Sequence, residues 1–91
     1  MTPTTMLSEI NRICRGYGPV MLGQEPRSKS WKLATPARHP QSLLPIEGIG
    51  SSPDAAVKDG WAAFSTVPFL LVFPHASTRR LCWDGRRFIP A

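Results

Sequence analysis

The sequence predicts a single small domain of the α+β class, with two helices and a mostly antiparallel sheet in the order α-β-β-β-α-β-β-β. Three observations predict it. Two segments carry apolar residues at helical spacing, several short apolar or alternating stretches lie around them, and Asp84-Gly85 is a strong hairpin signal. Because a chain of 91 residues has room for one core, residues 1–91 are expected to form one domain.

A first helix is expected over about residues 5–15. Its apolar residues recur at helical spacing and define one face: Met6, Leu7, Ile10, Ile13 and Cys14. Thr4 or Thr5 is expected to cap the start of this helix. Gly16 is expected to end it, because glycine adopts the left-handed backbone conformation at little cost.

Three short strands are expected to follow the first helix. They are Val20–Leu22, Lys29–Ala34 and Leu43–Ile49. In the second of these, Trp31 and Leu33 lie on one face and Ser30, Lys32 and Ala34 on the other, a pattern typical of a half-buried strand. Gly23 is expected to close the first strand, and Pro45 favours an edge or a bulge in the third. Residues 35–41 contain two prolines and are expected to form a loop.

A second helix is expected over about residues 53–65. Ser52 suits the capping position, and Pro53 suits the first helical position, where its missing N–H has no cost. The residues of its core stripe are Val57, Gly60, Trp61 and Phe64. Gly48 and Gly50 are expected to form a tight turn ahead of this helix.

The segment Phe69–Phe73 is apolar throughout, so a central strand that is buried on both faces is expected there. The complete expected core consists of Leu7, Ile10, Ile13, Trp31, Leu33, Val57, Trp61, Phe64, Leu70, Val72 and Leu81.

A C-terminal hairpin is expected over about residues 79–89, with Asp84-Gly85 as a two-residue turn. A turn of that length places Trp83 opposite Arg86 and Leu81 opposite Phe88.

Composition and spacing argue against several functional classes. The hydrophobic share of 42% is too high for a wholly disordered chain, and no apolar run is long enough to span a membrane. No secretory signal is visible, so a cytoplasmic location without membrane contact is expected. The Gly48–Pro53 loop lacks the spacing of a nucleotide-binding fingerprint, and no nucleophile motif is present. We therefore expect a protein that is not an enzyme and carries no cofactor.

The side chains best suited to a soft metal ion are far apart in the sequence. They are Cys14, His39, His75 and Cys82. Structural zinc sites use closely spaced ligand pairs, so no metal site is expected. Reduced thiols are expected in a cytosol, although a Cys14–Cys82 bridge stays open as an alternative.

The positive charge is the main functional signal. Lys and Arg total 11 against 6 acidic residues, which gives a net charge of +5. The candidate contact residues are Arg12, Arg15, Arg27, Lys29, Lys32, Arg38, Arg79, Arg80, Arg86 and Arg87. Such clusters suit a partner whose surface is acidic or lined with phosphate, although an ordinary solvated surface has the same composition.

From Leu7 to Phe64 the chain resembles the double-stranded-RNA-binding domain in outline. Gly48, Gly50, Ser52 and Ala56 match positions of that family's turn and second helix. The resemblance implies an α-β-β-β-α topology and binding to RNA. The family has phosphate-contacting lysines at three positions that this chain fills with Pro53, Asp54 and Val57.

The chain also resembles small phage-encoded α+β proteins. The matching segments are Trp31-Lys32-Leu33 and Gly50-Ser51-Ser52-Pro53-Asp54-Ala55-Ala56. In its size and single-domain organisation it is similar to anti-CRISPR proteins. That likeness implies a protein of a phage or mobile element that blocks a nucleoprotein complex in the cytoplasm of a bacterial host.

These observations lead to one main functional hypothesis and two alternatives. The main one is a non-enzymatic binding or inhibitory protein that blocks a host protein or nucleoprotein complex through a basic surface. The first alternative is a module that binds RNA or DNA directly. The second is a small structural protein that forms a homodimer through the edge of the Phe69–Phe73 strand.

Overall fold

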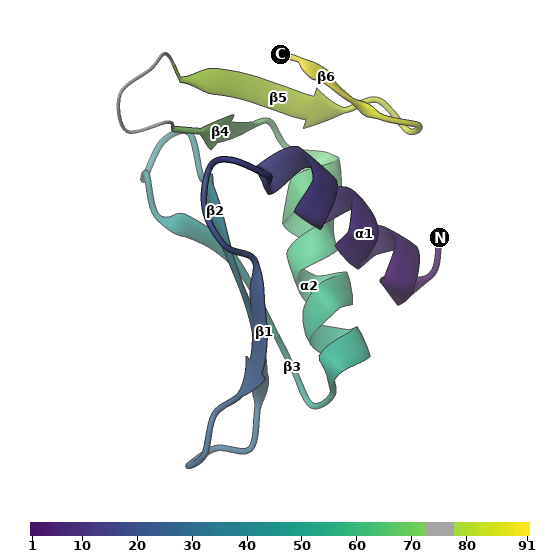
Figure 1. Cartoon of the computed structure of the whole chain (residues 1–91), viewed down its shortest axis with the longest axis vertical. Coiled ribbons are helices and arrows are strands. Elements are labelled where there is room, and N and C mark those ends of the chain that lie inside the picture. The colour runs from purple at the N-terminus through teal and green to yellow at the C-terminus, as the bar shows by residue number, and fades with distance from the viewer. Residues whose placement is uncertain (73–77) are drawn as a thin grey trace.

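The computed structural model describes residues 1–72 and 78–91 and has the expected α+β organisation, with two helices and a six-stranded antiparallel sheet (Figure 1). The elements are α1 (Pro3–Cys14), β1 (Met21–Gln24), β2 (Trp31–Arg38), β3 (Pro45–Gly50), α2 (Pro53–Thr66), β4 (Phe69–Leu71), β5 (Arg79–Trp83) and β6 (Phe88–Pro90). Their order along the chain confirms the predicted one.

Strand β2 organises the sheet. Its end residue Arg38 pairs with Pro45 of β3 on one edge and with Leu70 of β4 on the other. Strand β1 pairs with the first half of β2 on the edge that β4 uses further along. Strands β1 to β3 therefore run beside α2, while β4 to β6 cross over one end of the helices (Figure 1). Both helices lie on the same side of the sheet, which we call the inner face.

Helix α1 begins earlier than the sequence predicts. The hydroxyl of Thr2, not that of Thr4 or Thr5, accepts a hydrogen bond from the Thr5 amide at 3.2 Å. Pro3 then occupies the first turn, where a proline is tolerated because that amide needs no partner. The helix ends at Cys14, one residue before the expected end.

Strand β2 is longer than expected, so the loop predicted over residues 35–41 is wrong in its first half. The strand continues through Pro36 to Arg38, and its register with β3 shifts between Ala34 and Arg38. A proline is tolerated at such an irregularity because no ladder hydrogen bond is lost. The buried Thr35 hydroxyl donates to the Ile46 carbonyl at 2.9 Å and connects the two strands there.

Strand β1 and the two glycines of β3 also differ from expectation. Gly23 lies within β1 and does not close it. Gly48 and Gly50 lie in β3 and not in a turn. A side chain at Gly48 would collide with the backbone of Ala56 and Gly60 in α2. These glycines are therefore required for the close approach of the helix to the strand.

Helix α2 matches the prediction closely. The Ser52 hydroxyl accepts a hydrogen bond from the Ala55 amide at 3.1 Å, and Pro53 is the first helical residue. The carboxylate of Asp59 accepts a hydrogen bond from the Ile49 amide at 2.8 Å, which ties the middle of the helix to the outer edge of β3. That contact covers part of a sheet edge that would otherwise be open to pairing.

Most of the predicted core is confirmed, but β4 is oriented differently. Buried as expected are Ile10, Leu33, Val57, Trp61, Phe64 and Leu81, while Leu7, Ile13, Trp31 and Leu70 are half-buried. In β4 the buried residues are Phe69 and Leu71, and Val72 is 40% exposed. The two-sided burial predicted there is wrong, because both helices cover the inner face only. The predicted Phe73 lies outside the described residues.

Strand β4 is flanked on both sides, by β2 at Arg38–Leu70 and by β5 along its length. A homodimer formed through the edge of this strand would have to displace one of these neighbours. The hypothesis of such a dimer therefore lacks the free edge on which it was based.

The C-terminal hairpin exists, but its register is not the predicted one. Trp83 pairs with Phe88, not with Arg86, and Leu81 pairs with Pro90, not with Phe88. The loop is thus longer than two residues because the Asp84 carboxylate accepts hydrogen bonds from the amides of both Arg86 and Arg87, at 2.7 and 2.8 Å. This register brings the Phe88 ring against Trp83, with the centroids 4.9 Å apart.

The hairpin loop makes the stability of the domain dependent on the Asp84 charge. Hydrogen bonds from the Arg87 and Arg86 amides lower the pKa of this carboxyl below its ordinary value. A lowered pKa contributes stability above the ordinary aspartate pKa of about 3.9, and this contribution is lost as the pH falls through the folded-state value. We expect Asp84→Ala to be less stable than the native protein at pH 7 and to approach it at pH 3, measured by urea denaturation. A difference that stays constant with pH would contradict this.

The two loops that flank β2 have the same construction. In the β1–β2 loop the Lys29 amide donates to the Glu25 carbonyl, and in the β2–β3 loop the Leu43 amide donates to the His39 carbonyl, both at 2.9 Å. Each loop starts with a proline and has a serine at its third position, whose hydroxyl accepts from the amide two residues on. The fourth residue has a positive φ in both, 57° at Lys29 and 59° at Leu43.

The left-handed residue of the first loop gives a simple stability test. A side chain in this conformation costs about 1–2 kcal/mol, which glycine avoids. We expect Lys29→Gly to raise the free energy of unfolding by about 0.5–1 kcal/mol, after the greater flexibility of unfolded glycine is subtracted. Arg27→Gly, in the same loop but without a positive φ, is the control and is expected to lower it by about as much. Urea denaturation of the two variants measures whether the free energy of unfolding rises in the first and falls in the second, as expected.

Candidate binding surface

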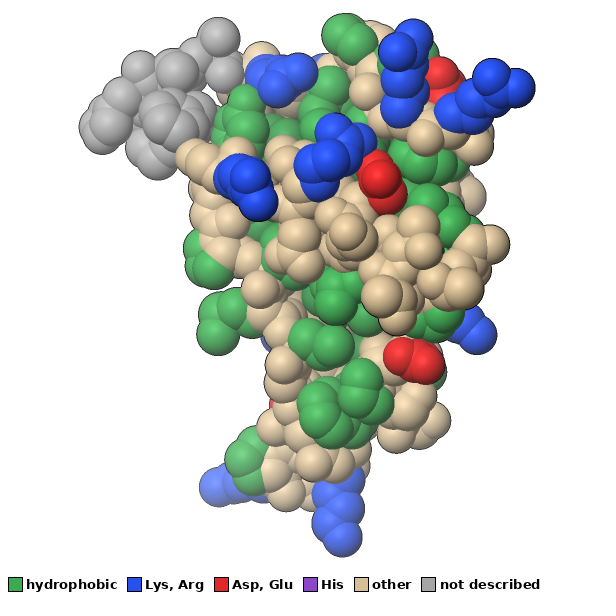
Figure 2. Space-filling view, turned by 45° about the vertical axis from the view of Figure 1, so that its right-hand side comes forward, with side chains coloured by type: hydrophobic (Ala, Val, Ile, Leu, Met, Phe, Trp, Pro, Cys, Tyr) green, Lys and Arg blue, Asp and Glu red, His purple; other side chains and the backbone are tan. Residues whose placement is uncertain are grey.

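The ten predicted contact residues do not form one continuous patch. Arg27 and Lys29 lie in the β1–β2 loop, at the tip of a hairpin that points away from β4, β5 and β6. Figure 2 shows Lys and Arg side chains gathered at this tip and, separately, at the opposite end of the molecule. Lys29 and Arg38 are close in the sequence, but strand β2 lies between them, so their side chains are at opposite ends of that strand.

Some of these charges are balanced locally. The ion pairs within the described residues are Arg12 with Glu9 and Lys32 with Glu47, each at 2.7 Å, and Arg87 with Asp84 at 4.0 Å. The hydrogen bond to Glu47 raises the pKa of the Lys32 ammonium. Exposed pairs of this kind add little stability, but they reduce the charge that is available to a partner.

Two arginines lie in one row on the side of the sheet opposite the helices, which we call the outer face. Arg38 of β2 is opposite Leu70 of β4, and Leu70 is opposite Arg80 of β5. Directly opposed residues share a face, and neighbours along a strand alternate. Since Phe69 is buried on the inner face, Arg80 lies on the outer face. Arg79 is opposite the buried Leu71 and lies on the inner side.

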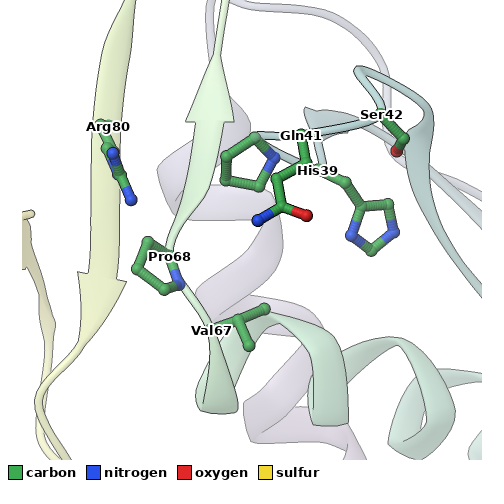
Figure 3. Close-up of a pocket in the computed structure, with 7 residues that line it drawn as sticks. His39, Gln41, Ser42, Val67, Pro68 and Arg80 are labelled. Atoms are coloured by element: carbon green, nitrogen blue, oxygen red, sulfur yellow. The ribbon is translucent and has the colours of Figure 1, made fainter.

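A hollow of about 670 Å³ adjoins this row, and we call it the Arg80 hollow. It is lined by His39, Pro40, Gln41, Ser42, Val67, Pro68 and Arg80. Figure 3 shows Arg80 entering from β5, beside Pro68, while Gln41 and His39 enter from the β2–β3 loop on the other side. None of these seven residues carries a carboxylate, so the lining combines polar donors with apolar walls.

The β2–β3 loop, which supplies much of the lining, also carries two exposed apolar residues. Leu43 is 53% exposed and Leu44 is 63% exposed, in the same loop that supplies much of the lining. Arg38 does not line the hollow, because its guanidinium donates to the Leu43 carbonyl at 2.9 Å. Arg38 therefore braces the loop, and Arg80 is the guanidinium that faces the hollow.

The residues considered for metal binding or nucleophilic chemistry are not brought together. Across residues 1–72 and 78–91, no three side chains of His, Cys, Asp or Glu form a group that could hold a metal ion. Cys14 and Cys82 are both free thiols, so the alternative of a disulfide between them is wrong. Burial raises the pKa of the Cys14 thiol to about 12, which makes it a poor nucleophile. His75 lies outside the described residues.

Sequence reasoning named Arg38 and Arg80 but missed the hollow beside them. In the sequence, His39 stands out only as a possible metal ligand, and Leu43 and Leu44 fall within an expected strand that in fact begins at Pro45. One signal was available: the β1–β2 and β2–β3 loops share a proline and a serine at equal spacing, which marks both as hairpin loops and exposes the residues between.

None of the helices within the described residues is long and apolar enough to cross a membrane. Comparison with protein-family models, with curated protein sequences and with solved structures finds no match to this chain. The surface chemistry of the outer face is therefore the basis for a functional assignment.

Proposed function

We propose that the protein is a non-enzymatic binding protein that occupies an acidic or phosphate-lined surface of a host protein or nucleoprotein complex. The observation that carries the proposal is the placement of Arg80, in register with Arg38, beside a hollow whose β2–β3 loop also carries exposed leucines. The resemblance to small phage-encoded proteins supports an inhibitory role for such binding.

The chemistry of this surface suits binding. A guanidinium forms two parallel hydrogen bonds to a carboxylate or a phosphate, which gives both affinity and orientation. Exposed apolar side chains such as Leu43 and Leu44 supply contact area that is removed from water in a complex. The net charge of +5 attracts an acidic partner at long range and raises the association rate.

Direct binding to nucleic acid is the second candidate, and one observation favours it. Arg27 and Lys29 lie at the exposed tip of the β1–β2 hairpin, where they could reach a phosphate backbone. The start of α2 is less suitable, because Asp54 is exposed in its first turn and Val57 is buried. Lysines at these positions make the phosphate contacts in double-stranded-RNA-binding domains, so that mode of binding has little support here.

Two single substitutions test the first candidate. Arg79 and Arg80 are neighbours on β5 with the same charge but lie on opposite faces of the sheet. We expect Arg80→Ala to reduce capture of partners from a lysate of the source organism at least about tenfold, a loss of about 1.4 kcal/mol. Arg79→Ala is the matched control and is expected to change capture less than about twofold. Equal capture by the two variants would refute the proposed surface.

A titration with naked nucleic acid tests the second candidate. Single-stranded and duplex RNA and DNA are added across a range of salt concentrations, with the native protein and with the Arg27→Ala/Lys29→Ala variant. Steep loss of affinity with salt, abolished in that variant, would establish direct nucleic-acid binding in place of the first candidate. The first candidate predicts no binding to naked nucleic acid even at low salt.

A further inference from the structure

We infer that the Arg80 hollow binds an acidic segment of a partner polypeptide, with a carboxylate on Arg80 and neighbouring apolar side chains against Leu43, Leu44 and Val67. This inference rests on the proposed function and names the chemical class of the partner at that site.

The lining of the hollow indicates a ligand that accepts hydrogen bonds. Arg80, Gln41 and Ser42 bring N–H and O–H donors to it, and His39 adds an imidazole. With no carboxylate among the lining residues, nothing repels an incoming anion or competes for the guanidinium. Described ion pairs involve Arg12, Lys32 and Arg87, and Arg80 is not among them.

The same lining favours a polypeptide over a nucleic acid. Proteins that hold single strands stack the bases on aromatic side chains and follow the backbone with several cations. The hollow offers one guanidinium, its apolar walls are Pro40, Val67 and Pro68, and its lining contains the His39 imidazole but no Phe, Tyr or Trp. The aromatic rings of Trp61, Trp83 and Phe88 pack on one another instead. A carboxylate flanked by aliphatic side chains matches one cation between apolar walls.

Leu43 supplies exposed apolar area in the loop that lines the hollow. A leucine at φ 59° is strained, since its side chain crowds the backbone where glycine would not. Its side chain is 53% exposed, so core packing does not compensate for the strain. The left-handed backbone is shared with Lys29 and follows from the construction of the loop, so the indication of a partner is the exposed apolar side chain itself, which a bound segment can cover.

The second hollow of the outer face does not have this chemistry. It has a volume of about 290 Å³, and its lining includes Glu25 and Lys32. The Lys32 ammonium is already paired with Glu47, and Glu25 would repel a carboxylate. The acidic segment is therefore assigned to the Arg80 hollow alone.

Fluorescence anisotropy with defined peptides tests the inference. The probe is a labelled eight-residue peptide that alternates glutamate with leucine, compared with a version in which glutamine replaces glutamate and with an oligomer of deoxythymidine. We expect the glutamate peptide to bind the native protein about tenfold more tightly than the glutamine peptide. Arg80→Ala is expected to weaken it about tenfold, Arg79→Ala less than about twofold, and Leu43→Gly about fivefold without loss of folding stability.

Three results would overturn the inference: equal binding of both peptides, tighter binding of the deoxythymidine oligomer, or Arg80→Ala without effect. The outcome also separates this inference from the proposed function. If Arg80-dependent capture of a partner persists but the glutamate peptide neither binds nor competes, only the acidic-segment assignment fails. If capture does not depend on Arg80, the proposed surface itself fails.

Discussion

Replacing Gly48 with alanine is expected to lower the free energy of unfolding by about 4 kcal/mol or more, which is enough to unfold a marginally stable small domain. A Cβ atom built at this position lies 2.5 Å from the Gly60 nitrogen and closer still to the Ala56 carbonyl oxygen. Both obstacles are helix backbone, which cannot rotate away as a side chain can. The helix would have to move off the strand, and the contact between α2 and β3 would be lost.

The chain supplies a matched control for this experiment. Gly23 also lies in a strand, and a Cβ built there meets no atom within 4 Å. Gly23→Ala is therefore expected to leave stability unchanged or to raise it by up to about 1 kcal/mol, because alanine is less flexible in the unfolded chain. Urea denaturation measures both variants. If Gly48→Ala proves as stable as Gly23→Ala, the close packing of α2 on β3 is wrong.

Phe88→Ala is expected to cost about 3 kcal/mol and to expose the tryptophans of the aromatic cluster. The Phe88 ring contacts Trp83 and Phe69 with centroid distances of 4.9 and 5.3 Å, and it approaches Trp61 at 5.8 Å. Strand β6 is three residues long, so this ring is its main attachment to the inner face. Its removal should release β6 and shift tryptophan emission to longer wavelength.

Ile89 is the control for this second substitution. It is the next residue along β6, it pairs with Cys82, and it lies on the outer face, away from the aromatic cluster. Ile89→Ala is expected to cost less than about 1.5 kcal/mol and to leave the tryptophan emission in place. The assignment of the two faces of β6 would be reversed if Ile89→Ala shifted the emission and Phe88→Ala did not.

Those parts of the fold that depend on local signals were predictable. Ser52 and Pro53 define the start of α2, because the capping hydroxyl and the proline act within one turn. At α1 the capping residue is Thr2 and not Thr4 or Thr5, and Pro3 after it occupies the first turn. Both helices therefore begin with a hydroxyl cap followed by a proline, but three neighbouring threonines make the start of α1 ambiguous in the sequence.

Two features of the later strands did not follow from the sequence pattern, one for a local reason and one because it depends on distant segments. The register of the C-terminal hairpin follows Asp84, whose two amide hydrogen bonds override the usual two-residue turn. The orientation of β4 depends on which face the helices cover, and a uniformly apolar segment carries no alternation to reveal it.

The candidate surface, too, was predictable in its residue types but not in the placement of those residues. Composition identified the arginines, but the choice between Arg79 and Arg80 requires the pairing of β5 with β4. The hollow forms where the β2–β3 loop meets the α2–β4 junction and β5, segments far apart in sequence. A list of basic residues therefore overstated the surface, because it included side chains that are paired with acids or lie at the other end of β2.

The two loops at the ends of β2 have the same backbone construction although they carry different side chains. In both loops a proline, a serine and a residue with positive φ stand at the same positions. The backbone of each loop therefore does not depend on the other side chains that the loop carries. One loop displays cations and the other displays leucines. A few substitutions in either loop can therefore change the side chains exposed at that end of the molecule without altering the fold.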